Sequence, residues 1–244
     1  MTLGFLSPVT DGDAPPASPL EPWLLEAAAR FEERDGWRVA VSFGALEDEL
    51  EALRGSAGIA DRSSMGKLEL QGTPEALGSL LAGVVPGGPP EAGETADLDG
   101  ALLWLSSPDR ALAICEPADT ASLWDLLGAL CGVSPHCGVV ELTAGLAAIE
   151  LRGPRARELL ERLTAIDVRD TGLPTGGVRA GAVAEVPATL LRPEDNSFLI
   201  LVGAQEAPDA WEIVIDAGAP LGARPVGAEA LARVEPRLGA LARA

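Results

Sequence analysis

The sequence predicts an α+β fold made of two pseudo-repeated halves, each of the form β-α-β-β-α. The first observation behind this prediction is an internal repeat, since residues 59–81 resemble residues 139–163. The second is the alternation of apolar and polar residues in the strands KLELQG and AIELRG of that repeat. The third is the segment RARELLERLTAI, in which apolar residues recur at the spacing of an amphipathic helix.

Corresponding positions of the two repeats carry similar residues. The matched pairs are Asp61 with Glu141, Ser63 with Thr143, Lys67 with Ala148, and Gly72 with Gly153. The match continues through a hairpin and ends in helices that carry Trp124 in the first half and Trp211 in the second. Lys67 is the only lysine in the chain, and the repeat keeps its strand while replacing it with alanine. We therefore expect Lys67 to be a solvent-facing strand residue and not a nucleophile.

Two further helices are expected ahead of the repeat, PWLLEAAARFEERDG and ALEDELEALRG, joined by the short strand WRVAVSF. The segment PGGPPEAGET reads as a flexible loop because of its glycines and prolines. The expected organisation is a disordered tail over 1–20, one domain over 21–236 with lobes at about 56–130 and 138–218, and a tail over 237–244. The chain beyond Arg233 reads as a frayed helix.

Composition excludes several functional classes. The chain has 37 acidic and 18 basic residues, a net charge of −19, which argues against binding to duplex nucleic acid or to an anionic membrane surface. It lacks an apolar run of about 18 residues, so we expect no membrane span. The first residues do not resemble a secretory signal. Three cysteines without such a signal indicate reduced thiols and a cytoplasmic protein.

Simple catalytic and metal motifs are not evident. His136 is the only histidine, and its surroundings lack the signature of a catalytic triad. Cys131, His136 and Cys137 do not have the paired spacing of a structural zinc site, and the glycine clusters lack the context of a nucleotide loop. We expect no metal, flavin or nicotinamide bound by this chain. A local stripe of arginines is interpreted mainly as a solvated helix face, with an acidic partner as the alternative. Its members are Arg152, Arg155, Arg157, Arg162 and Arg169.

Four segments, in order, resemble the glycine-cleavage T-protein (aminomethyltransferase) family. They are RDGWRVAVSFGALEDELEALRGSAGIADRSSMGKLELQG, SSPDRALAICEPADTASLWDLL, ELRGPRARELLERL and ARPVGAEALARVE. The resemblance covers approximately residues 20–236. It implies the aminomethyltransferase folate-binding fold, with tetrahydrofolate in a central channel and transfer of a one-carbon unit from an aminomethyl donor. The family includes the gamma subunit of heterotetrameric sarcosine oxidase, which works beside a larger flavoprotein.

The resemblance also implies site residues. The aspartate pair that contacts the reactive folate amine corresponds to Asp99 and Gly100, which leaves Asp99 as the catalytic carboxylate. Residues implied for binding the cofactor are Met65 in the Met-Gly-Lys turn, Glu116 at the position of an asparagine, and Arg233.

Several positions depart from the family pattern. Leu199 stands where a glutamate grips the pterin ring, although Glu194 or Asp195 is close enough in sequence to substitute. Glu229 replaces an arginine, no tyrosine is present to line the channel, and the small C-terminal barrel has no counterpart. Each pterin donor left unpaired in a buried pocket would cost about 1–3 kcal/mol.

Three hypotheses remain open on the sequence. The first is a tetrahydrofolate-binding, aminomethyltransferase-like enzyme with a divergent site. The second is a non-catalytic accessory subunit, similar to the sarcosine oxidase gamma subunit, that docks on a flavoprotein or amine oxidase. The third is a regulator or orphan domain with the folate-binding fold and no chemistry.

Overall fold

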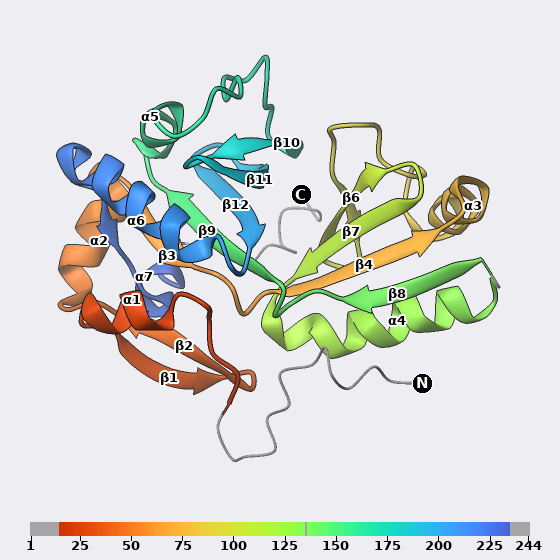
Figure 1. Cartoon of the computed structure of the whole chain (residues 1–244), viewed down its shortest axis with the longest axis horizontal. Helices are drawn as coiled ribbons and strands as arrows, with labels where there is room; N and C mark the ends of the chain where they lie inside the picture. The colour runs from red at the N-terminus through yellow and green to blue at the C-terminus, as the bar shows by residue number, and fades with distance from the viewer. Residues whose placement is uncertain (1–14, 135, 235–244) are drawn as a thin grey trace. The chain divides into compact units, whose positions relative to one another are not determined.

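The two sequence repeats form two sheets of matching strand order. The computed structural model describes residues 15–134 and 136–234. One compact unit, the five-stranded unit, contains residues 65–143. The other, the six-stranded unit, contains the described residues up to 64 and from 144 onward. The expected α+β fold of two pseudo-repeated halves is confirmed (Figure 1).

The five-stranded unit has the strand order β5-β6-β7-β4-β8, with all neighbours antiparallel. Its strands are β4 (Gly66–Gly72), β5 (Ala96–Leu98), β6 (Ala101–Ser107), β7 (Arg110–Cys115) and β8 (Cys137–Glu141). Its helices are α3 (Pro74–Val84), the short η1 (Pro117–Asp119) and α4 (Thr120–Gly132). The leucines of β4, β6, α3 and α4 form one buried core, so the helices cover an apolar face of the sheet. Residues 86–95 form the expected loop, apart from a bridge residue at Glu94.

The six-stranded unit repeats this order as β10-β11-β12-β9-β3 and adds β13 at the edge. Its sheet strands are β3 (Gly58–Asp61), β9 (Leu146–Arg152), β10 (Gly177–Val183), β11 (Val186–Glu194), β12 (Ser197–Gly203) and β13 (Arg224–Pro225). The helices of this repeat are α5 (Ala156–Glu161) and α6 (Ala207–Gly218), followed by η2 (Ala219–Leu221) and α7 (Ala228–Leu231). Leu159 and Leu160 of α5 and Trp211 of α6 are buried against the sheet, as the helical spacing predicts.

The repeats exchange their first strands. β3 belongs to the first repeat but pairs with β9 of the second, and β8 belongs to the second repeat but pairs with β4 of the first. The compact units therefore do not follow the sequence repeats, and each repeat contains two strands beyond the predicted β-α-β-β-α pattern.

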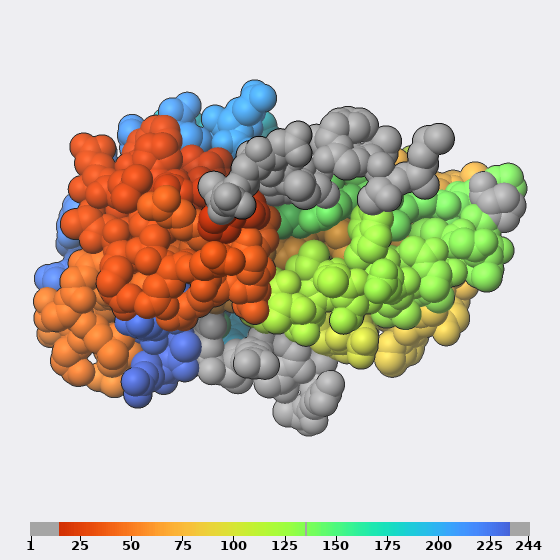
Figure 2. All heavy atoms as spheres, turned by 90° about the horizontal axis from the view of Figure 1, so that it is seen from below, coloured from red at the N-terminus to blue at the C-terminus, as the bar shows by residue number. Residues whose placement is uncertain are grey.

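The N-terminal segment differs from the prediction at one element. The first predicted helix ends early, as α1 (Glu21–Glu26), and RFEER forms strand β1 (Arg30–Arg34). β1 pairs with β2 (Trp37–Ser42) across Asp35 and Gly36, whose φ values are +50° and +77°. Two consecutive positive φ values suit a two-residue hairpin turn, and Asp-Gly is a strong signal for one. The segment therefore closes a hairpin instead of extending the helix. Residues of this N-terminal segment, red and orange in Figure 2, gather on one face of the unit.

The second predicted helix is confirmed as α2 (Leu46–Gly55), which packs its leucines against Leu231 of α7. Of the expected N-terminal tail, residues 1–14 lie outside the described residues, whereas Leu20 is fully buried and Ala17 bridges to Arg38. The tail expected over 237–244 also lies outside the described residues. No helix in the described part of the chain is long and apolar enough to cross a bilayer.

Candidate functional site

Three of the four predicted site residues lie along the same edge of the five-stranded sheet, where its strands begin or end. Gly66 at the start of β4 is opposite Cys115 at the end of β7, so Met65 and Glu116 lie just beyond paired strand ends. β6 runs antiparallel to β7 with Leu102 opposite Ile114, which brings the β5–β6 turn, containing Asp99, to the same edge. We call Met65, Asp99 and Glu116 the β4–β7 edge.

Asp99 is exposed at the tip of a two-residue turn. Its φ is +52° and that of Gly100 is +88°, a conformation that aspartate tolerates better than most residues. The corresponding turn of the second repeat, Ala184–Glu185, also has two positive φ values, +50° and +65°. The turn therefore belongs to the repeated scaffold, and only the first repeat places an aspartate at its first position.

Glu116 is half-buried and begins the short helix η1, where its carbonyl accepts a hydrogen bond from the amide of Asp119 at 3.0 Å. The neighbouring Cys115 thiol is buried. Burial raises the pKa of this thiol, and the negative charges of Asp119 and Glu116 act in the same direction. Cys115 is therefore a residue of the core of the five-stranded unit.

Lys67 contradicts the expectation of a solvent-facing side chain, since the residue is fully buried. Its Nζ donates a hydrogen bond to the carbonyl oxygen of Met65 at 2.8 Å, and its backbone amide donates one to Oγ1 of Thr143 at 3.1 Å. Lys67 lies on β4, which has a neighbour on both sides, and a backbone carbonyl supplies a polar partner for the charged group. Met65 is also buried, with 1% of its surface exposed, so it contributes a carbonyl to this arrangement.

Arg233, the fourth predicted residue, belongs to the six-stranded unit, where it is exposed just after α7. Glu229, at the position of the family's arginine, pairs with Arg30 at 2.7 Å and with Arg34 at 3.7 Å. The acidic replacement is thus neutralised by arginines of the β1–β2 hairpin.

The position of the pterin-binding glutamate carries no polar group. Leu199 lies inside β12 with 2% of its surface exposed. The two nearby acids are already paired, Glu194 with Arg152 at 2.7 Å and Asp195 with Arg192 at 3.4 Å. Asp195 also accepts a hydrogen bond from Thr175 at 2.8 Å.

A buried network around Glu150 was not anticipated from the sequence. Its carboxylate accepts hydrogen bonds from Arg152 at 2.8 Å and Ser197 at 2.9 Å, and it pairs with Arg62 at 3.4 Å. Burial alone would raise the pKa of Glu150, but the two arginines outweigh it and hold this pKa below the ordinary value. The only signal in the sequence was a glutamate at the polar position of the strand IEL.

The predicted arginine stripe is paired with nearby acids. Arg155 and Arg162 contact Glu158, Arg157 contacts Asp170, and Arg169 contacts Asp167. Hydrogen bonding from Arg169 lowers the pKa of Asp167 to about 2. These four arginines are therefore a salt-bridged surface, whereas Arg152 belongs to the Glu150 network. Cys131 is buried near the end of α4.

The chain resembles known proteins over most of its length. A family model described as the GCVT N-terminal domain matches residues 99–242. An aminomethyltransferase of Anoxybacillus flavithermus is 26% identical over 225 residues, which cover 86% of this chain and 60% of that protein. One of Synechococcus elongatus is 30% identical over 221 residues, which cover 83% of this chain and 58% of that protein. The chain thus spans less than two thirds of the length of these relatives.

Two solved structures share the fold. The glycine cleavage system aminomethyltransferase T of Bartonella henselae superposes with a TM-score of 0.68 at 18% identity, covering 89% of this chain and 61% of that chain. A chain of the heterotetrameric sarcosine oxidase of Corynebacterium sp. U-96 gives a TM-score of 0.61 at 24% identity, covering 86% of this chain and 97% of that chain. The family match spans more than half of the sequence, and the chain therefore belongs to the GCVT N-terminal domain family, that of the aminomethyltransferases.

Proposed function

We propose that the chain binds tetrahydrofolate at the β4–β7 edge and supports transfer of an aminomethyl one-carbon unit to it. Asp99 is the catalytic residue in this proposal, because it would contact the folate amine that receives the one-carbon unit. The observation that carries the proposal is the placement of Asp99, Glu116 and the Met65 turn along one sheet edge. Membership of the family supports it.

The residues at this edge suit the amine end of the ligand. Asp99 presents an exposed carboxylate on a two-residue turn, and Glu116 adds a second, half-buried carboxylate. A carboxylate accepts a charge-assisted hydrogen bond from a protonated amine, which is stronger than a neutral one. The fit is poorer at the pterin end, because Leu199 is apolar and buried. Recognition at that end therefore falls to other groups, and the proposal rests on the amine end.

When bound, tetrahydrofolate supplies the amine that accepts the one-carbon unit. The protein's part is orientation and electrostatics, since a fixed carboxylate that meets developing positive charge lowers the barrier without forming a bond. The carboxylate of Asp99 would hold the proton of the acceptor amine. The short turn between β5 and β6 limits how far that carboxylate moves.

A comparison of two turn variants tests this role. In Asp99→Asn we expect one-carbon transfer to fall about 100-fold while the tetrahydrofolate-induced rise in melting temperature is kept. Asp109→Asn is the matched control, because Asp109 lies in the turn at the opposite end of β6 and β7. Formation of the substituted folate, followed by mass spectrometry, measures transfer. Equal transfer by wild type and Asp99→Asn would remove Asp99 from the mechanism.

A second candidate function is that of an accessory subunit in an amine-oxidase complex. The observation that favours it is the likeness in fold to a chain of the heterotetrameric sarcosine oxidase of Corynebacterium sp. U-96, with a TM-score of 0.61 at 24% identity. The test is co-expression with a flavin-containing amine oxidase from the same organism. A stoichiometric complex on size-exclusion chromatography supports this function, and elution as separate proteins contradicts it.

A further inference from the structure

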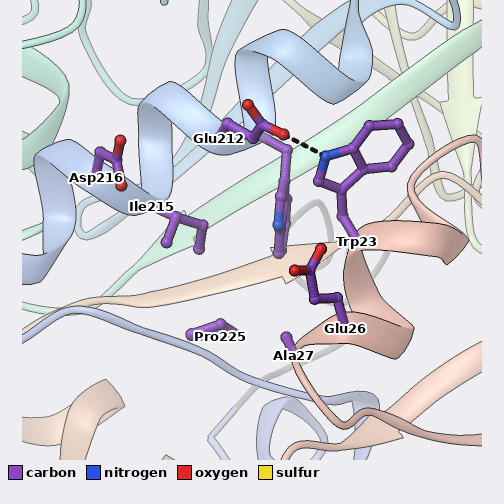
Figure 3. A pocket seen from close by; sticks show the side chains of 8 residues that line it. Trp23, Glu26, Ala27, Glu212, Ile215, Asp216 and Pro225 are labelled. Atoms are coloured by element: carbon purple, nitrogen blue, oxygen red, sulfur yellow. Dashed lines mark hydrogen bonds between the residues drawn. The ribbon is translucent and has the colours of Figure 1, made fainter.

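A cavity in the six-stranded unit lies between the N-terminal helix α1 and helix α6. It has a volume of about 380 Å³, which is within the range of small-molecule sites. Its walls come from α1, α6 and β13, elements from the two ends of the described chain (Figure 3). The β4–β7 edge belongs to the five-stranded unit, so nothing in this cavity depends on the proposed function.

Two tryptophans contribute to the wall. Trp211 is buried in α6, and Trp23 of α1 is half-buried beside it. The indole Nε1 of Trp23 donates a hydrogen bond to Oε1 of Glu212 at 2.5 Å, which ties α1 to α6 and fixes the Trp23 ring. Ile215 and Pro225 add apolar surface. Indole faces carry partial negative charge and attract cations more strongly than other aromatic rings.

The charged groups of the cavity are all acidic. Glu212 and Asp216 lie one turn apart on α6, and Glu26 lies at the end of α1 (Figure 3). None of the eight residues that line the cavity is basic. Glu212 uses its Oε1 atom for the hydrogen bond with Trp23. Three carboxylates around two indoles create a negative potential in a partly apolar space.

We propose that this cavity binds a small organic cation of the substituted-ammonium class. The indoles provide cation–π contacts and Ile215 and Pro225 contact alkyl groups, while the carboxylates neutralise the charge. A metal ion suits the cavity less well, because hard cations require several converging oxygen ligands. In the described residues, no group of three or more His, Cys, Asp or Glu side chains is arranged to hold a metal. An anion is excluded by the acidic lining.

The test uses choline chloride as the probe and its uncharged carbon isostere, 3,3-dimethylbutan-1-ol, as the matched ligand. Indole N–H resonances of the full chain are followed by NMR, with Trp23→Phe used to assign the signal of Trp23. We expect saturable shifts of the Trp23 and Trp211 signals with choline, and affinity for the isostere at least about tenfold lower. Equal affinity for the two ligands, or no saturable shift at millimolar choline, would overturn the proposal.

Two variants locate the binding. Glu26→Gln removes an exposed charge from the cavity without changing the core, and we expect several-fold weaker choline binding. Glu33→Gln is the control, because Glu33 is exposed on β1 and does not line the cavity. Trp23→Leu should weaken binding about tenfold. If Glu26→Gln and a folded Trp23→Leu both bind choline as wild type does, the cavity is not the site.

Discussion

The side chain of Thr143 accepts a hydrogen bond from the backbone amide of Lys67 at 3.1 Å. Its repeat partner Ser63 makes the corresponding bond with the amide of Ala148 at 3.2 Å. The carbonyls of Lys67 and Ala148 in turn accept bonds from residues 142 and 62, both at 2.8 Å. Each unit thus joins the exchanged strand with the same pair of bonds. In each case, a hydroxyl from one repeat anchors the first residues of the other repeat's central strand.

We predict that Thr143→Val destabilises the protein by about 1–3 kcal/mol. The substitution keeps the shape of the side chain but leaves the buried amide of Lys67 without its acceptor. Thr143→Ser retains the oxygen and is the matched control. Urea denaturation measures the difference, and Ser63→Ala should show a loss of similar size in the other unit. A valine variant as stable as the serine variant would show that the bond does not contribute to stability.

Gly66→Ala should destabilise the β4–β7 edge by about 1–3 kcal/mol. A Cβ at this position would lie 2.3 Å from Oγ1 of Thr120 and 2.8 Å from Sγ of Cys115, so the start of β4 would have to move. Gly78→Ala is the control, because Gly78 lies in α3 with nothing within 4 Å of the added atom. For Gly78→Ala we expect a stabilisation of about 0.5–1 kcal/mol, because alanine has a higher helix propensity than glycine. Thermal denaturation of both variants measures these opposite effects, and a Gly66→Ala melting point at or above that of wild type would contradict the steric argument.

Glu150→Gln should cost about 3–5 kcal/mol at neutral pH, since it removes the buried carboxylate that pairs with Arg62 and one of the two carboxylates that pair with Arg152. The folded pKa of Glu150 lies below its unfolded value of about 4.3, so the carboxylate stabilises the fold fully above that value. This stabilisation is lost as the pH falls through the folded pKa.

Urea denaturation measures the free energy of unfolding of wild type and Glu150→Gln. The difference between the two values should therefore decrease as the pH drops well below 4. Glu158→Gln is the control, because Glu158 is a surface residue whose salt bridges with Arg155 and Arg162 are exposed to solvent. We expect little change for it at either pH. If the difference in unfolding free energy between wild type and Glu150→Gln stays constant over this pH range, the Glu150 carboxylate is not charged in the folded protein.

Local patterns predicted the repeat well. The alternation in LEL and IEL and the apolar spacing of α5 depend on neighbours a few positions away, so the sequence contains that information directly. The matched pair Ser63 and Thr143 was also found by comparing the two repeats. The strand exchange was not predicted, because pairing of β3 with β9 joins residues about 90 positions apart, beyond the reach of any local pattern.

The predictions for RFEER and Lys67 were wrong, because contacts in the structure override the usual preference of these residues. RFEER consists of residues that are common in helices, which is why a helix is predicted there. The Asp35-Gly36 turn favours a hairpin and overrides this helix propensity. Lys67 was expected at the surface because lysine is seldom buried, yet its ammonium group is buried and donates a hydrogen bond to a carbonyl two residues away. Part of the candidate site was accessible from sequence, since Asp99, Glu116 and Met65 follow from motif positions. The α1–α6 cavity was not, because Trp23 and Glu212 are 189 positions apart.

Calorimetric titration of the full chain with tetrahydrofolate tests the central claim most directly. The proposed site predicts a saturable heat of binding with tetrahydrofolate. Asp99→Asn should retain most of the affinity for tetrahydrofolate. No heat of binding at millimolar tetrahydrofolate would contradict the account and leave the accessory-subunit function as the better explanation of the fold.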